Sequence, residues 1–282
     1  MVGSDPENLL AEKRIPTTNP EDTIRQVIEF FDPYTRKGTL KAVGIASFGP
    51  IDLNLDSHTY GYITTTPKPG WKNIDLLGEI KNKLKIPVAF ETDVNAAAFG
   101  EQFWKEENRH LDPFLYMTVG TGIGVGVIVN GAPLHGLMHA EAGHSTIPHD
   151  FEKDPFPGIC PYHGDCLEGL ASGHSMFKRW GQAPETLPDS HPAWEIEADY
   201  LALALVNLIY AYSPRKIILG GGVFQHPGLI QSVRSKVQAI NNGYIQSDRI
   251  SDHIEDYIQP PFLGNRSGAL GAIAMAINLV RS

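Results

Sequence analysis

The chain has 282 residues, of which 42% are hydrophobic and 20% are charged, as is ordinary for a globular protein with one large or two smaller domains. Its formal net charge of −9 argues against nucleic acid or an anionic membrane as the main partner, because both select for basic surfaces. The opening stretch, MVGSDPENLL, lacks the basic flank and the apolar core of a signal peptide. We therefore expect a cytoplasmic protein that binds neither membrane nor nucleic acid.

Strand-like and helix-like patterns alternate along the chain, which predicts an α/β fold. Apolar, β-branched runs predict strands at residues 41–47, 86–92, 114–119, 124–130 and 216–222. Apolar residues at helical spacing predict helices at about residues 19–31, 94–108, 195–212, 227–240 and 267–281. The dipeptide Asp112-Pro113 follows a charged stretch and marks a candidate boundary between two domains.

Polar side chains gather where the predicted strand 86–92 meets the next helix, in the segment FETDVNAAAFGEQFW. Glu91, Asp93, Asn95 and Glu101 stand there among apolar residues. Asp93 has two interpretations at this position. It is either the N-cap of the helix, the commonest role of Asp there, or a carboxylate that accepts a proton from a substrate hydroxyl.

Two glycine-rich turns are candidates for binding phosphate or nucleotide. In TVGTGIGVGVIVNG the turn Gly120-Thr121-Gly122 lets backbone N–H groups and a hydroxyl approach an anion, although many tight hairpins look alike. In ILGGGV a buried strand runs into the glycines at 220–222, which suits a nucleotide or simply a close packing contact. The first stretch is not a P-loop, because the Lys-Ser/Thr ending is missing and no helix follows it.

Both cysteines of the chain fall in the stretch CPYHGDC, on either side of His163. A structural disulfide is not expected in the cytoplasm, and redox pairs of the thioredoxin type have two intervening residues rather than five. Cys160, His163 and Cys166 instead offer three ligands for a structural zinc ion, with His144 as the fourth ligand and His149 as the reserve. Residues 145–192 show little periodicity, and this zinc would hold them together.

The order of these motifs resembles that of the ROK family (repressor, open reading frame, kinase) over nearly the whole chain. The matching stretches, in order, are DVNAAAFGE, GTGIG, EAGH, the Cys/His loop ending in CLEGLASG, and ILGGGV. The loop CPYHGDC, with SFGPIDLNLDSHTYGYITTTPKPGW upstream, looks like that of the bacterial ROK fructokinases. Most members have Cys-x-Cys-Gly-x-x-Gly-Cys at this loop.

The resemblance implies an actin-like ATPase (ribonuclease-H-like) fold, with two α/β domains and the active site in the cleft between them. The sugar-side domain would comprise residues 1–112 and 268–282, and the nucleotide- and zinc-binding domain residues 113–267. The implied activity is ATP-dependent phosphorylation of D-fructose to fructose 6-phosphate. The implied cofactors are Mg²⁺ with ATP and a structural Zn²⁺, and we expect a homodimer.

The resemblance also assigns roles to single residues. Asp93 matches the catalytic base, and His144 would bind zinc through one nitrogen and sugar through the other. The residues that match sugar ligands are Asn95, Glu141, His144, Glu168 and Gly70, the last within the loop Pro67–Trp71. The residues that match ATP-binding positions are Thr121, Gly122, Gly220, Gly221, Gly222 and Val223.

One element of the family pattern is not found in the sequence. ROK kinases open with a strand bearing Asp/Glu-x-Gly-Gly-Thr-Lys, the first phosphate loop, and nothing here matches it. We expect the natural gene to encode about ten or more residues upstream of Met1 that include a Gly-Gly-Thr turn.

Three alternatives to a fructokinase follow from these patterns. The first is a glucokinase or mannokinase of the same family. The second is a sugar-binding module that lacks catalysis because the first phosphate loop is absent. The third, a ROK repressor, requires an N-terminal helix-turn-helix and a basic face, and the sequence shows neither.

Overall fold

The computed structural model describes residues 1–281, which fall into two compact units. Unit 1 comprises Met1–His110, Ala132–Ala140 and residues 266–281, and unit 2 comprises Leu111–Gly131 and Glu141–Asn265. The sequence-based division left residues 132–140 in the C-terminal domain, whereas their contacts group them with unit 1. Two histidines of this segment explain the difference, because His135 contacts Glu91 and His139 accepts the Ile51 N–H at 3.1 Å.

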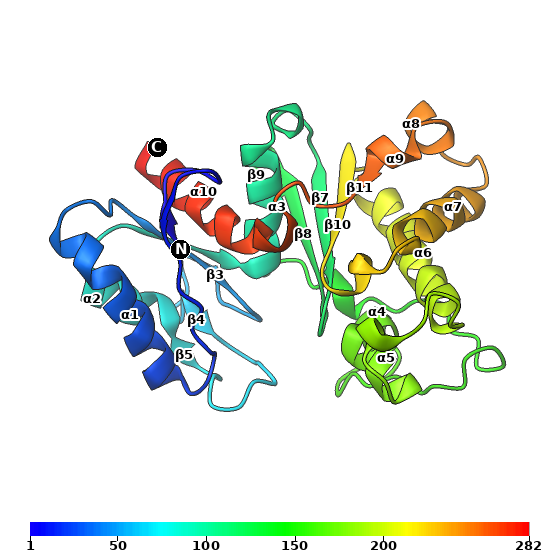
Figure 1. Cartoon of the computed structure of the whole chain (residues 1–282), viewed down its shortest axis with the longest axis horizontal. Helices are drawn as coiled ribbons and strands as arrows, with labels where there is room; N and C mark the ends of the chain where they lie inside the picture. Colours follow the sequence, from blue (N-terminus) through cyan, green and yellow to red (C-terminus); the bar gives the residue numbers. More distant parts are fainter. Residues whose placement is uncertain (282) are drawn as a thin grey trace. The chain divides into compact units, whose positions relative to one another are not determined.

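Unit 1 contains three two-stranded sheets, β1-β2, β3-β6 and β4-β5 (Figure 1). β3 (Val43–Ser47) pairs in parallel with β6 (Val88–Thr92), and β1 (Val2–Gly3) pairs antiparallel with β2 (Leu9–Ala11). The helices are α1 (Pro20–Arg36), α2 (Leu76–Leu84), α3 (Asp93–Trp104) and α10 (Ser267–Arg281). The remaining elements are β4 (Tyr62–Ile63), β5 (Ile74–Asp75), β9 (Ala132–Pro133) and a 3-10 turn at Glu106–Asn108.

Side-chain caps begin the helices of unit 1. Asn19 accepts the Asp22 N–H at 2.9 Å ahead of α1, and the Asp75 carboxylate accepts the Gly78 N–H at 2.8 Å at the start of α2. Helix α1 runs to Arg36, beyond the predicted end at 31, and α3 stops at Trp104 rather than 108. The predicted boundaries are therefore wrong by about one turn at these two C-termini, where side-chain signals are weakest.

Helix α10 packs directly on β3 and on α3, and glycines allow this close approach. A Cβ atom at Gly44 of β3 would overlap the carbonyl oxygen of Ala272, and one at Gly271 would overlap that of Ala96 in α3. The Trp104 indole donates to the Leu270 carbonyl oxygen at 2.9 Å. These contacts hold α3 firmly against the end of the chain.

Unit 2 contains a mixed sheet in which the strand order is β11-β10-β7-β8. β10 pairs in parallel with β7 and β11, whereas β7 and β8 form an antiparallel hairpin. The strands are β7 (Phe114–Val119), β8 (Ile123–Val129), β10 (Lys216–Gly220) and β11 (Ile258–Gln259). The helices are α4 (Leu167–Ala171), α5 (Gly173–Trp180), α6 (Ala193–Tyr212), α7 (Leu229–Asn241), α8 (Asp248–Ser251) and α9 (Ile254–Tyr257). Three 3-10 turns complete the unit, at Ala142–His144, Pro184–Thr186 and Val223–Gln225, and a further one at Gly264–Arg266 begins at its end.

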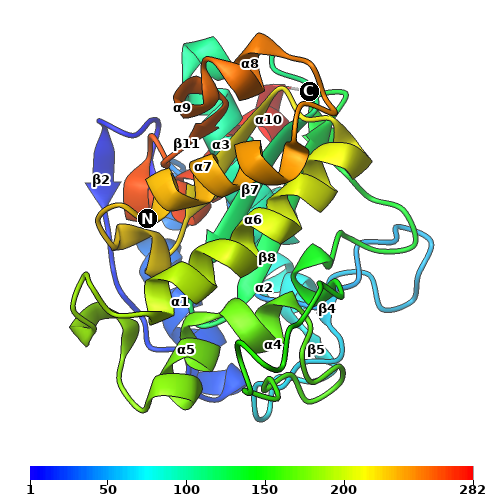
Figure 2. The ribbon, with the colours of Figure 1, turned by 90° about the vertical axis from the view of Figure 1, so that its right-hand side faces the viewer.

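The 20-residue helix α6 is the longest of the protein and lies side by side with α7 (Figure 2). Twelve of its residues are buried, which explains why its sequence is apolar on nearly all sides. Across residues 1–281, α6 included, no helix combines the length and apolarity that crossing a bilayer requires.

A buried ion pair holds the aperiodic segment that precedes α4. Asp154 accepts from Arg179 of α5 at 3.0 and 3.1 Å and from the Tyr200 hydroxyl of α6 at 2.7 Å. His149, the reserve zinc ligand, contacts the Asp154 carbonyl oxygen through Nε2 at 2.9 Å and Asp165 through Nδ1 at 3.1 Å. The segment is thus anchored by a polar network that sequence analysis did not anticipate.

The buried carboxyl of Glu197 on α6 generates a stability prediction. Neither of its oxygens has a hydrogen-bond partner among the described residues. Burial raises the pKa of Glu197 well above its ordinary value, an effect that the Arg179 charge partly opposes. The stabilising contribution of the bound proton is therefore present at acid pH and is lost as the pH rises through the folded-state pKa.

We expect Glu197→Met to raise the free energy of unfolding by about 1–3 kcal/mol at neutral pH, because it removes an unsatisfied buried group. The gain should shrink toward acid pH. Urea unfolding at several pH values measures both effects. Glu195→Met, at the exposed position two residues earlier, is the control and should change stability by less than about 0.5 kcal/mol. Equal changes in the free energy of unfolding for the two substitutions would contradict the conclusion that the buried carboxyl of Glu197 destabilises the fold.

Candidate active site and metal cluster

The carboxyl end of β6 places Asp93 at the first position of α3. The hydroxyl of Thr92, not the carboxylate of Asp93, caps this helix, since it accepts the Asn95 N–H at 3.1 Å. Asp93 Oδ1 accepts the N–H of Val94 at 2.9 Å. The interpretation of Asp93 as the N-cap is therefore wrong, and its carboxylate is left available for chemistry.

The carboxylate of Asp93 borders a cavity within unit 1, and protein atoms around that cavity partly desolvate it. Its side chain is exposed and lines a cavity of about 900 Å³. Desolvation raises the pKa of Asp93, while the Val94 N–H and the charge of Lys68 act in the opposite direction. A carboxylate with a raised pKa is a stronger proton acceptor, as a general base requires.

The buried carboxylate of Glu91 organises the residues around Asp93. Its Oε2 accepts the N–H of Thr92 and the amide Nδ2 of Asn95, both at 2.8 Å, and its Oε1 contacts Nε2 of His135. The bond to Glu91 raises the pKa of His135, which favours the imidazolium form. Asn95 is thus held in one orientation beside the candidate base.

Sequence analysis noted Glu91 without giving it a role, and it missed His135 and His139. The available signal was the pair of histidines in LHGLMHAEAGH, but their partners lie far away in the sequence. Glu101, the fourth polar residue at this joint, accepts the Ser267 hydroxyl at 2.8 Å and so ties α3 to α10. Gly70 lies in the loop Pro67–Trp71 with φ +80°, a conformation that favours glycine.

In unit 2, Glu168 is held against the turn between β7 and β8. Its Oε2 accepts the Ile123 N–H at 2.8 Å. A Cβ atom at Gly122 would lie 2.5 Å from that oxygen, so glycine is needed there for the carboxylate to approach. The turn itself is closed by the Gly120 N–H, which donates to the Gly122 carbonyl oxygen at 2.9 Å, and Thr121 is exposed at its tip.

The three glycines after β10 differ in what they do. A Cβ at Gly220 would overlap the Tyr116 hydroxyl, and one at Gly221, where φ is +95°, would overlap the Val119 carbonyl oxygen. Packing against β7 therefore explains these two glycines. Gly222 faces open space among the described residues, and Val223 begins a 3-10 turn. The open side of Gly222 is where a ligand has room.

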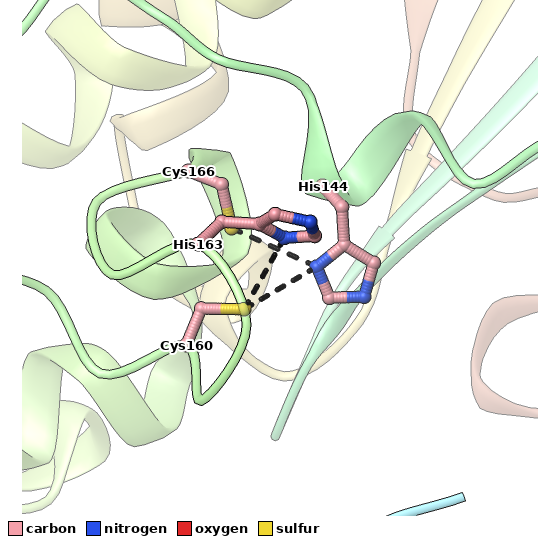
Figure 3. A group of neighbouring side chains, drawn as sticks. All are labelled: His144, Cys160, His163 and Cys166. Carbon is pink, nitrogen blue, oxygen red and sulfur yellow. Dashed lines mark hydrogen bonds between the residues drawn. The ribbon is translucent and has the colours of Figure 1, made fainter. Parts of the chain in front are cut away.

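His144, Cys160, His163 and Cys166 converge as sequence analysis predicted (Figure 3). One nitrogen or sulfur atom from each lies within 4.8 Å of the others. Nδ1 of His144 lies 3.7 Å from Cys160 Sγ and 3.6 Å from Cys166 Sγ, and Nδ1 of His163 lies 3.5 Å from Cys160 Sγ. His149 lies in the Asp154 network instead, so the geometry brings His144 and not His149 to the cluster.

The donor chemistry of this cluster fits a zinc ion. Two sulfurs and two imidazoles form a closed set of four soft or borderline ligands, as structural zinc sites require. Burial raises the pKa of the Cys166 thiol to about 11, so a bound cation is needed to hold this sulfur as a thiolate at neutral pH.

One imidazole connects this cluster to the β7–β8 turn. While Nδ1 of His144 faces the sulfurs, its Nε2 lies 3.9 Å from Oε1 of Glu168. The backbone N–H of His144 donates to the carbonyl oxygen of Glu141 at 3.0 Å, which places Glu141 one turn earlier with an exposed side chain. Three of the predicted sugar ligands are therefore neighbours in unit 2.

Comparison with known proteins places this arrangement in a family, because the ROK family model matches residues 1–278. The chain belongs to the ROK family. It is 42% identical to a fructokinase of Lactococcus lactis over 273 residues, covering 96% of this chain and 90% of that protein. It is also 42% identical to a fructokinase of Zymomonas mobilis over 283 residues, covering 98% of this chain and 91% of that protein.

Solved ROK structures confirm the fold. A ROK hexokinase from Thermus thermophilus superposes with a TM-score of 0.77 at 24% identity, covering 99% of this chain and 94% of that one. A ROK glucokinase from Streptomyces griseus, solved with glucose and AMPPNP, superposes with a TM-score of 0.72 at 21% identity. The match covers 98% of this chain and 94% of that one. The predicted actin-like ATPase fold is thus the fold of this ROK protein.

The two glycines of the β7–β8 turn provide a matched pair of substitutions. Gly122→Ala should displace the Glu168 carboxylate and leave the Ile123 N–H without its acceptor, which costs about 1 kcal/mol of unfolding free energy. Gly120→Ala should change little, because no described atom lies within 4 Å of the added methyl group. Chemical denaturation of both variants measures the difference. A Gly120→Ala variant as unstable as Gly122→Ala would contradict this view of the turn.

Proposed function

We propose that this protein transfers the γ-phosphoryl group of ATP to D-fructose, giving fructose 6-phosphate. The observation that carries the proposal is the identity of 42% to two fructokinases over nearly the whole chain. The accessible Asp93 carboxylate at the β6–α3 junction is the group in unit 1 best suited to serve this reaction as a base.

In the proposed reaction the 6-hydroxyl oxygen attacks the γ-phosphorus, and the bond from that phosphorus to the β-γ bridging oxygen breaks. The hydroxyl proton passes to the carboxylate of Asp93, and ADP leaves. Phosphoryl transfer depends more on positioning and charge stabilisation than on the base. We assign phosphate binding to Thr121 and Gly122 and nucleotide binding to Gly220, Gly221, Gly222 and Val223. Magnesium, carried with ATP, neutralises phosphate charge when bound.

The sugar ligands that we propose are polar groups already held by neighbours. Asn95 is oriented by Glu91, and Glu168 is oriented by the Ile123 N–H. His144 faces Glu168 through Nε2, Glu141 precedes His144 at the start of the same 3-10 turn, and Gly70 contributes from the sugar-side loop. Groups fixed in advance lose little conformational entropy when a hexose binds.

We assign the His144 cluster to a structural zinc ion. All four ligands come from the protein, so no position is left for a substrate at the metal. The ion would fix the orientation of His144 and, through it, the nitrogen that faces Glu168. The cytoplasmic location and the homodimer stay predictions from the sequence.

Two other activities are tested by the same experiment, which measures ATP consumption against fructose, glucose and mannose. The proposal predicts the highest kcat/KM with fructose. Highest efficiency with glucose or mannose would instead identify a glucokinase or mannokinase of the same family. Binding of fructose without any turnover would identify a sugar-binding module.

Asp93→Asn tests the assignment of the base. We expect kcat to fall by about 10²–10⁴-fold while fructose and ATP still bind, because the amide cannot accept the proton. Stability should not fall, since Thr92 caps α3 and burial of the Asp93 charge is unfavourable. Steady-state kinetics and thermal unfolding measure the two effects.

Thr92→Ala is the matched control for that experiment. It should lose about 1 kcal/mol of stability through the missing cap, yet retain a functional base. An Asp93→Asn enzyme that turns over normally would show that another group accepts the proton.

Zinc content tests the metal assignment. Purified protein should contain one zinc ion per chain, with ligand distances of about 2.0–2.3 Å by X-ray absorption. Cys160→Ser should lose most of the metal, whereas His149→Gln should retain it, because His149 is bonded to Asp154 and Asp165. Well under one equivalent of metal in a normally folded wild-type protein would overturn the assignment.

A further inference from the structure

The turn at residues 135–139 carries one histidine onto the buried carboxylate of Glu91. His135 and His139 form an antiparallel bridge across this turn. The buried ring of His139 accepts the Ile51 N–H at 3.1 Å, which anchors the turn within unit 1. The opposite residue of the bridge, His135, is thereby placed with its Nε2 at Oε1 of Glu91.

The two partners of this contact differ in their access to water. The side chain of His135 is 40% exposed, whereas that of Glu91 is 6% exposed. Solvent can therefore exchange the imidazole proton, while the carboxylate depends on its protein donors. The hydrogen bond to Glu91 raises the pKa of His135 more than partial burial lowers it. The fold thus favours the imidazolium form, and the contact is an ion pair.

The other oxygen of Glu91 fixes which way the Asn95 amide is turned. Asn95 Nδ2 donates to Oε2 of Glu91 at 2.8 Å. An ionised carboxylate only accepts hydrogen bonds, so the NH₂ end of the amide must face it. Asn95 Oδ1 is therefore the atom that this side chain offers to the hydroxyl of a ligand. Because Asn95 is buried, its neighbours rather than bulk solvent set its orientation.

The other ionisable groups near Glu91 can be distinguished from His135. Burial raises the pKa of Tyr60, and the charge of Glu91 adds to this effect, so the phenol is neutral at physiological pH. Burial lowers the pKa of His139, and its Nε2 accepts an N–H, so this ring is neutral as well. Burial raises the pKa of Asp93, the candidate base, so reaction rates would report on that group too. Ligand binding compared between the wild type and a His135 variant separates these contributions.

We infer that His135 is a positioning residue for Asn95, because its imidazolium holds the Glu91 carboxylate that orients the Asn95 amide. Loss of the imidazole proton turns a charge-assisted hydrogen bond into a weaker one, with roughly half the strength. The orienting effect is therefore complete below the ordinary pKa of histidine and declines as the pH rises through the raised folded-state pKa of His135. That the ligand is a hexose rests on the proposed function, whereas the coupling of His135 to Asn95 does not.

Nuclear magnetic resonance of the full chain without ligand tests the coupling. We expect the side-chain amide signals of Asn95 to titrate together with the His135 ring, at a pKa above the ordinary 6.5 of histidine. His135→Gln keeps a donor but carries no charge, so the Asn95 titration should disappear. His58→Gln, at an exposed histidine of the same unit, should leave it unchanged. An Asn95 amide that does not follow His135, or that titrates equally in His135→Gln, would overturn the inference.

Calorimetry with fructose alone tests the consequence for binding. The dissociation constant of the wild type should rise about fivefold as the pH passes through the titration of His135, the difference expected between a charged and a neutral hydrogen bond. His135→Gln should show the weaker constant at every pH, and His58→Gln should behave as the wild type does. A wild-type dissociation constant that stays the same over this range would overturn the positioning role. Absence of fructose binding at every pH would contradict only the proposed function, since the amide titration then decides the inference.

Discussion

The carboxylate of Glu91 is the interaction on which the arrangement of unit 1 depends most. A buried carboxylate is costly unless donors surround it, and here it receives the Thr92 N–H, the Asn95 amide and His135. These donors belong to the end of β6, the first turn of α3 and the segment at residues 132–140. The Glu91 carboxylate therefore fixes how β6 passes into α3 and in which direction Asn95 points. Asp93 lies between Thr92 and Asn95 in the sequence, so the same hydrogen bonds position it.

A comparable constraint operates in unit 2, where His144 belongs to two sets of contacts. One ring nitrogen faces the cysteine sulfurs, and the other faces the carboxylate that receives the Ile123 N–H. A metal in the cluster would thus set the position of Glu168, the carboxylate that we propose as a sugar ligand. Ordering the loop of the cluster and ordering this carboxylate would then be the same event.

Local sequence patterns predicted the parts of this structure that depend on local physics. The strand at 216–220 is buried throughout, and the strand at 114–119 is buried at every position except Thr118. The four residues of the His/Cys cluster could be chosen because three of them occur within one short loop. Helix α2 was missed because it is short and follows a loop without clear periodicity. The link between His135 and Glu91 could not be predicted, because the two residues are 44 positions apart and meet only through tertiary packing.

The identity of the reaction product tests the central claim most directly. Phosphorus NMR of a reaction with ATP and fructose distinguishes phosphate esterified at carbon 6 from phosphate at carbon 1 and from free phosphate. The account predicts fructose 6-phosphate and ADP in equal amounts, formed about 10²–10⁴-fold more slowly by the Asp93→Asn variant. Free phosphate in place of a sugar ester, or an ester at another hydroxyl, would contradict the assignment of Asp93 as the base for the 6-hydroxyl.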